Sequence, residues 1–353
     1  MNCATERDDL IDLTSPDWLL AGFGEGRELF QFARVSRQTY RDSSFLDHRI
    51  KPLPERVTTA TGIEVDLTLA KLGSRPAAYV FHTAFCASTL LALCLDHPGR
   101  TLVLREPKVL ARLGALQRDT PSAGSVQMGR LKQRVFGLLD RSYDGEAVVI
   151  KPSNFANSLL QDVLDEGSAT GERHRCLLLS YSLRNLIISI LKNEPEARER
   201  MPVFLEALLR DSDYLELTGL PPLESLDLLQ QSAVFWHCQR HFFQCIKCPS
   251  GTRQLLPVSM ETFLVRPLDT LVAINEFLQL GLSEALLIEV VERGEFRRHS
   301  KTGAGYGPEQ QLLEAQAIAQ RHDAEIRRTM KWAAPLLRAM PVEPFSDDEE
   351  GFT

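Results

Sequence analysis

The stretch Ala77–Asp96 reads AAYVFHTAFCASTLLALCLD and has the pattern of a strand, a short loop and a helix. Ala77–Phe81 is a short apolar run typical of a buried strand, and the spacing predicts a helix from about Ser88 to Leu95. Ser88 and Thr89 stand where that helix should begin. Backbone N–H groups at a helix start, together with such hydroxyls, suit a phosphate-like anion. The same residues also fit an ordinary turn in which Ser88 caps the helix.

Three more apolar runs follow, each before a segment with helical spacing. Strands of four or five residues that alternate with helices predict βαβ units, and hence a parallel sheet with helices on both faces. In such sheets ligands bind beyond the carboxyl ends of the strands, so the residues after each run are candidate site residues. The runs and their helices are Thr101–Leu104 with Lys108–Gln117, Ala147–Ile150 with Phe155–Leu164, and Cys176–Ser180 with Arg184–Lys192.

The regions around this core predict three parts of the chain. Residues 1–75 are expected to form a helical N-terminal extension, because Asp17–Leu20 and Leu29–Ala33 have helical spacing. Residues 76–345 are expected to form the α/β domain, with a helical insertion at about 195–250, and residues 346–353 form an acidic tail. Four further elements are predicted: a strand or helix at Gly62–Leu72, a last strand at Leu255–Met260, a helix at Leu268–Leu280 and one long helix at Glu309–Arg338.

Composition excludes several classes of protein. The 353 residues are 44% hydrophobic and 25% charged, which is typical of a globular chain and not of a collagen, a coiled coil or a disordered protein. The net charge of −7 gives no overall attraction for nucleic acid. No apolar stretch is long enough to span a bilayer, and the N-terminus is acidic where a secretory signal is basic. We therefore expect a cytoplasmic protein without a membrane span, whose seven cysteines are free thiols.

The loop after the first strand resembles a known motif. AFCAST is similar to the 5′-phosphosulfate loop, PKSGTTW or PRSGTT, of sulfotransferases that use 3′-phosphoadenosine 5′-phosphosulfate (PAPS). Ser88 and Thr89 match the two hydroxyl positions and Ala87 matches the Gly, with Cys86 before it, whereas Phe85 replaces the family's Lys or Arg. The loop is not the GxxxxGK[ST] of nucleoside triphosphatases. The resemblance implies a P-loop NTPase-like α/β sheet, PAPS as co-substrate and no metal.

Two strand ends resemble catalytic segments of the same family. VVIKPSNFANSLL is similar to IKTHLPxxLLP, which implies that Lys151 stabilises the bridging and leaving oxygens and that Ser153 stands in place of the catalytic His. LREPKVL is similar to the EP motif of bacterial and glycan sulfotransferase-like proteins, which makes Glu106 a candidate base. Alternatively, Lys151 is an exposed lysine, and Glu106 pairs with its neighbours Arg105 and Lys108.

Two later segments resemble the family's 3′-phosphate site. In CLLLSYSLRNLIISILK, Ser189 matches the family Ser, and Tyr181 matches the family Arg. Arg184 lies three residues further and is the substitute cation if both residues share a helix face; alternatively, it is a surface arginine. FRRHSKTGAGYG is similar to FxRKGxxGDW and adds Arg297, Arg298, Lys301 and Gly303, which otherwise belong to a solvated basic loop. VSMETFLV, with Glu261, resembles a structural segment of the family.

A competing pattern lies between residues 237 and 248. His237, Cys238, His241, Cys245 and Cys248 include an i, i+4 histidine pair and a CxxC half-site, as in structural zinc sites. The neighbouring aromatic residues read instead as a buried helix with ordinary core thiols. The sequence leaves this question open.

The resemblance implies transfer of a sulfuryl group from PAPS to a hydroxyl or amine of a small-molecule, glycan or peptide acceptor. A second reading is phosphoryl transfer from a nucleoside triphosphate, for which Asp96 and Glu106 are the only nearby acids for Mg²⁺. A third is a non-catalytic descendant that binds nucleotide or protein, because Phe85 and Ser153 replace the family's cation and His.

Overall fold

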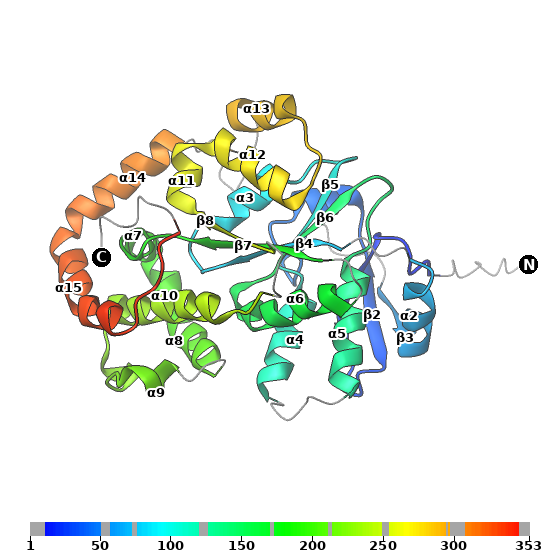
Figure 1. The fold of residues 1–353 in the computed structure, drawn as a ribbon, viewed down its shortest axis with the longest axis horizontal. Coiled ribbons are helices and arrows are strands. Elements are labelled where there is room, and N and C mark those ends of the chain that lie inside the picture. The colour runs from blue at the N-terminus through cyan, green and yellow to red at the C-terminus, as the bar shows by residue number, and fades with distance from the viewer. Residues whose placement is uncertain are drawn as a thin grey trace, which may run out of the picture.

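A computed structural model describes residues 11–50, 57–72, 76–119, 126–169, 173–210, 214–248, 254–293, 296 and 308–345. A parallel five-stranded sheet of order β5-β6-β4-β7-β8 lies at its centre (Figure 1). The strands are β4 (Ala78–His82), β5 (Thr101–Arg105), β6 (Ala147–Lys151), β7 (Arg175–Ser180) and β8 (Leu255–Ser259). All five runs predicted from the sequence are therefore strands, displaced by a residue or two at some of their ends.

Helices cover both faces of this sheet because its strands are apolar on both sides. Tyr79 and Phe81 pack into one hydrophobic cluster, whereas Ala78 and Val80 pack into another on the opposite face. The first face carries α4 (Lys108–Asp119), α5 (Val126–Leu139), η1 (Asn154–Leu159) and α6 (Leu160–Ala169). The second carries α3 (Ser88–Cys94), α11 (Met260–Val265), α12 (Pro267–Leu278) and α13 (Glu284–Arg293). The predicted α/β class is confirmed.

The helical prediction for two N-terminal segments is wrong. Asp17–Leu20 and Leu29–Ala33 contribute to β1 (Trp18–Phe23) and β2 (Leu29–Arg34), which form an antiparallel sheet with β3 (Val57–Thr61). In β2, Phe30 and Phe32 are buried while Leu29 and Gln31 are exposed, so burial alternates with the period of a strand. The segment left open at Gly62 is helix α2 (Gly62–Leu69), which begins with a capping box between Thr61 and Glu64.

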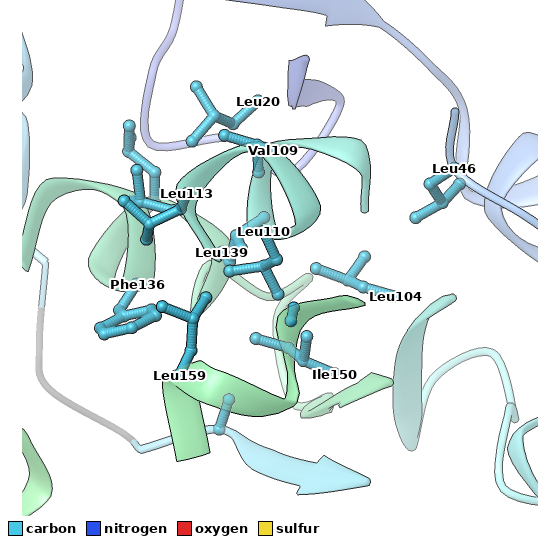
Figure 2. Packing of buried hydrophobic residues seen from close by; sticks show 14 of the residues in the cluster. Leu20, Leu46, Leu104, Val109, Leu110, Leu113, Phe136, Leu139, Ile150 and Leu159 are labelled. Carbon is cyan, nitrogen blue, oxygen red and sulfur yellow. The ribbon is translucent and has the colours of Figure 1, made fainter. Parts of the chain in front are cut away.

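The N-terminal sheet shares a hydrophobic cluster with the central sheet. Figure 2 shows Leu20 beside Val109 and Leu113 of α4, in the same cluster as Leu104 and Ile150 of the central strands. Helix α1 (Arg37–Asp42) is attached by a buried ionic network. Asp96 binds Arg37 at 2.7 Å and Arg105 at 3.1 Å, and Arg105 Nε donates to the Ser43 carbonyl at 2.8 Å.

The remaining helices pack against one another in a third hydrophobic cluster. Residues 195–245 are mostly helical, as expected. The prediction of one long helix at Glu309–Arg338 is wrong, because the helix is interrupted at His322. The second helix begins at Asp323, and its first turn carries the acidic residues Asp323 and Glu325. None of the helices in the described ranges is long and apolar enough to span a membrane. These helices are α7 (Leu183–Lys192), α8 (Glu194–Leu209), α9 (Tyr214–Thr218), η2 (Leu223–Ser225), α10 (Leu228–Cys245), α14 (Pro308–Arg321) and α15 (Asp323–Ala339).

Candidate functional site

The neighbouring strands β4 and β6 send their following segments to opposite faces of the sheet. Leu90 and Leu91 of α3 pack on one face, and Leu159 and Leu160 of η1 and α6 pack on the other. In doubly wound sheets, ligands bind in the crevice outside the carboxyl ends of such strands. The candidate site therefore lies beyond the ends of β4, β5 and β6.

Strained backbone is concentrated at this edge of the sheet. Phe85, Ala87 and Glu106 have φ values of 59°, 57° and 52°, and Arg27 and Gln279 are the other non-glycine residues with positive φ in the described ranges. The left-handed conformation costs a residue with a Cβ about 1–2 kcal/mol, and such strain clusters at functional sites. Ala87 therefore adopts a conformation that only Gly adopts without strain.

Ser88 and Thr89 begin α3 directly after the strained loop. They are 6% and 8% exposed, and the N-cap is Ala87, which makes no side-chain cap bond. The reading in which Ser88 is the helix cap is therefore wrong. Cys86 is buried, and burial raises the pKa of its thiol to about 11 despite the nearby charge of Lys151. Cys86 is thus a neutral thiol that contributes backbone and volume.

Lys151 and Glu106 are joined at the ends of adjacent strands. Lys151 Nζ donates to Glu106 Oε1 at 2.6 Å, and the Glu106 N–H donates to the Lys151 carbonyl at 2.6 Å. The side chains are 1% and 18% exposed. Burial alone would raise the pKa of Glu106, but the charge and hydrogen bond of Lys151 outweigh it and lower the pKa. Lys151 is therefore not an exposed lysine, and the partner of Glu106 is Lys151.

His82, the last residue of β4, was missed by the sequence reasoning. Its Nδ1 lies 3.0 Å from the Thr83 carbonyl and its Nε2 lies 3.1 Å from the Pro152 carbonyl, so the ring lies between the loops after β4 and β6 and, when neutral, donates to one of these two carbonyls. Burial, and then the charge of Lys151, lowers the pKa of His82 to about 4, which keeps it neutral at pH 7. A polar residue at the end of an apolar strand was the available signal.

Ser153 lies two residues beyond Lys151, at the position where the resembling segment has its catalytic His. Its Oγ is buried and has no hydrogen-bond partner among the described residues. Nearby, Asn157 Nδ2 donates to the His82 carbonyl at 3.1 Å. A serine hydroxyl without a basic partner cannot take the role of the family's His.

Arg184 and Ser189 do not converge on one point. Tyr181 precedes α7, so helix geometry does not relate it to Arg184, which is the second residue of the helix. Ser189 is five residues further, about 7.5 Å along the axis and about 140° around it. The Arg184 side chain is half-buried. Arg297, Arg298, Lys301 and Gly303 lie outside the described residues.

Two other carboxylates are already engaged. Asp96 precedes β5 and binds Arg37 and Arg105, and Arg37 also contacts Thr101 and Glu146 at the amino ends of β5 and β6, so Asp96 is not an open metal ligand in the crevice. Glu261 accepts hydrogen bonds from the Ser182 N–H and from Asn185 Nδ2, both at 2.7 Å, and so attaches α11 to the start of α7. This contact agrees with the structural reading of the Glu261 segment.

The residues of the zinc-like pattern are divided between core and surface. His237 is buried, with Nδ1 facing the Tyr214 hydroxyl and Nε2 2.7 Å from the Met340 carbonyl, which leaves neither nitrogen for a metal. Cys238 is buried, and Cys245 Sγ lies 3.6 Å from His241 Nε2. In the described part of the chain no three His, Cys, Asp or Glu side chains are grouped as they would be around a metal ion.

Comparisons with known proteins find a distant structural likeness. No protein-family model matches the chain, and no curated protein matches it. Similar solved structures include a sulfotransferase domain from the curacin biosynthetic pathway (13% identity, 71% of this chain, 99% of that chain, TM-score 0.39). Another is the sulfotransferase domain of the Synechococcus PCC 7002 olefin synthase (15% identity, 71% of this chain, 95% of that chain, TM-score 0.39). A third is a sulfotransferase from Alicyclobacillus acidocaldarius (15% identity, 72% of this chain, 97% of that chain, TM-score 0.34).

Proposed function

We propose that this protein is a PAPS-dependent sulfotransferase whose donor binds outside the carboxyl ends of β4 and β6. The observation that carries the proposal is the pair formed by Lys151 and Glu106 beside the strained loop that precedes Ser88 and Thr89. Sulfuryl transfer needs a cation where the bridging oxygen gains charge, and hydroxyl and N–H donors for the transferring group. These groups belong to three adjacent segments of the sheet edge.

Each residue then has a defined role. Ser88 and Thr89 hold the 5′-phosphosulfate through their hydroxyls and the first N–H groups of α3, with Cys86 and Ala87 as the backbone of the loop. Lys151 transfers its hydrogen bond from Glu106 to the bridging oxygen. Glu106, released from its partner, accepts the proton of the attacking acceptor hydroxyl or amine, while Ser153 takes no part in proton transfer.

The other end of the donor extends toward α7. Arg184 is the cation proposed for the 3′-phosphate, together with the loop of Arg297, Arg298, Lys301 and Gly303. Ser189 lies about one and a half turns further along the helix, which makes it the weaker member of this set. The acceptor is a small molecule, a glycan or a peptide with a hydroxyl or amine.

A non-catalytic descendant that only binds nucleotide is the second candidate. Two observations favour this candidate. Lys151 is 1% exposed and already paired with Glu106, and Phe85 replaces the cation of the loop. Phosphoryl transfer is a weaker alternative because Asp96 is held by two arginines and Glu106 by Lys151.

Thermal unfolding with added nucleotides separates these readings. Adenosine 3′,5′-bisphosphate should raise the melting temperature, because a ligand present at 100 times its Kd adds about 2.7 kcal/mol to the stability of the native state. ATP with Mg²⁺ should have a smaller effect. Ser88→Ala should weaken the shift, whereas Ser225→Ala, on an exposed 3-10 helix, should not change it. Release of adenosine 3′,5′-bisphosphate from PAPS with added acceptors then distinguishes an enzyme from a binding protein.

A further inference from the structure

The C-terminal turn of α10 carries a thiol beside an imidazole. Cys245 is the last residue of the helix, and its Sγ lies 3.6 Å from Nε2 of His241, one turn earlier. The pair lies outside the candidate sulfotransferase site and has no part in the proposed transfer. A second exposed thiol, Cys248, follows three residues later.

The other described cysteines are protected from oxidation by burial. Cys86, Cys94, Cys176 and Cys238 are each at most 1% exposed. Burial raises the pKa of Cys86 to about 11 and that of Cys176 well above the usual range, so both remain thiols. Since the thiolate is the nucleophile, the reactive thiols among the described cysteines are the exposed pair, Cys245 and Cys248.

His241 is placed to accept the proton of Cys245. Its ring is fixed next to Tyr214, with the centroids 6.2 Å apart. Burial raises the pKa of Cys248, and the contact with the imidazole belongs to Cys245.

The segment between the two thiols is held by one side chain. Gln161 of α6 accepts from the Lys247 N–H at 3.0 Å and donates to the Lys247 carbonyl at 3.1 Å. Lys247 separates Cys248 from Ile246 and Cys245, so this double contact orders the short connection. Cys248 follows this ordered residue directly, and its thiol is also close enough to Cys176 to contribute to the raised pKa of that buried group.

We propose that Cys245 and Cys248 form a peroxide-sensitive dithiol, in which Cys245 is attacked first and Cys248 completes a disulfide. The Cys245 thiolate displaces hydroxide from hydrogen peroxide and becomes a sulfenic acid, and the hydroxide leaves as water with the proton held by His241. Cys248 then attacks the sulfenic sulfur, and its proton leaves with the hydroxyl group as a second water. Two thiols are oxidised by two electrons and one peroxide is reduced to two waters.

Tryptic mapping of the intact protein tests this directly. Lys247 lies between the two cysteines, so trypsin separates peptide 241–247 (HFFQCIK) from peptide 248–253 (CPSGTR). After treatment with hydrogen peroxide and blocking of free thiols, the non-reduced digest should contain these two peptides joined. Cys248→Ser should stop at a sulfenic acid on Cys245 that dimedone traps, and Cys245→Ser should give neither product.

The imidazole is tested by His241→Gln, which keeps a polar side chain without a base. We expect disulfide formation to become about tenfold slower, because the thiolate fraction falls. Three results would overturn the proposal: no link between the two peptides, a link from 248–253 to 176–184 through Cys176, or an unchanged rate in His241→Gln. The first two need only the wild-type protein and so do not depend on the folding of a variant.

Discussion

Replacement of Lys151 by Met should destabilise the protein through the carboxylate that it leaves behind. The change removes the ammonium group but keeps an unbranched apolar stem of similar length. Removal of one partner of a buried ion pair costs about 3–5 kcal/mol, because the other charge stays buried without compensation. Glu106 keeps 18% of its side-chain surface exposed, so water can reach it. We therefore expect the free energy of unfolding to fall by about 3 kcal/mol, the lower end of this range.

A double-mutant cycle isolates the pair itself. Glu106→Gln leaves Lys151 charged and 1% exposed, but the amide oxygen still accepts the hydrogen bond from Lys151. We therefore expect the free energy of unfolding to fall by about 2 kcal/mol. Lys151→Met with Glu106→Gln leaves no buried charge and should cost no more than either single change, again about 2 kcal/mol. The coupling free energy is then about 3 kcal/mol.

The pH dependence of these variants follows from the pKa of Glu106. Because Lys151 lowers that pKa, the pair stabilises the wild type above the ordinary glutamate value of 4.5, and this stability is lost as pH falls. Without Lys151, burial raises the pKa of Glu106. Glu106 of the variant therefore takes up a proton on acidification, and the cost of an unpaired buried carboxylate disappears. The difference in stability between wild type and Lys151→Met should therefore shrink from pH 7.5 to pH 4.5.

Urea unfolding followed by far-ultraviolet circular dichroism measures these differences. Lys132→Met is the matched control: Lys132 also binds a carboxylate, Asp162, at 2.6 Å, but the two side chains are 16% and 25% exposed. It should cost less than about 1 kcal/mol. The reasoning is refuted if the single changes at Lys151 and Glu106 add within about 0.5 kcal/mol, or if the difference does not change with pH.

Three further predictions concern binding, acid stability and the strained loop. Arg184→Ala should weaken binding of adenosine 3′,5′-bisphosphate by about ten- to a hundredfold and leave adenosine 5′-phosphosulfate nearly unchanged in calorimetry, since charge-assisted bonds to phosphate are strong; equal losses would contradict its assignment. Burial raises the pKa of Asp140 well above 3.8, so wild-type stability should fall as pH rises above about 4, by up to about 1.4 kcal/mol per unit, and Asp140→Asn should lack this slope in urea unfolding. Ala87→Gly should raise the free energy of unfolding by about 0.5–1 kcal/mol by relieving φ of 57°, while Gly145→Ala, at φ 76°, should lower it; a loss in both variants would contradict the strain.

The α/β core was predictable because its determinants are local in the sequence. Apolar runs such as Ala147–Ile150 alternate with helical spacing, and that alternation is sufficient to predict a parallel sheet. The same logic failed at Leu29–Ala33, where a five-residue segment is too short to separate a period of 3.6 from a period of 2. Pairing with β1 and β3 decides in favour of a strand there.

The sequence by itself determined which residues reach the carboxyl edge of the sheet. Ser88, Glu106 and Lys151 each follow or end a strand, and parallel strands end on one side. Only the tertiary structure decided their contacts, because the side-by-side position of β5 and β6 brings Lys151 to Glu106 rather than leaving it in solvent. It also decided that His82 bridges two loops and that Arg184 and Ser189 diverge. Contacts between residues distant in sequence depend on strand order and helix rotation, which no local pattern encodes.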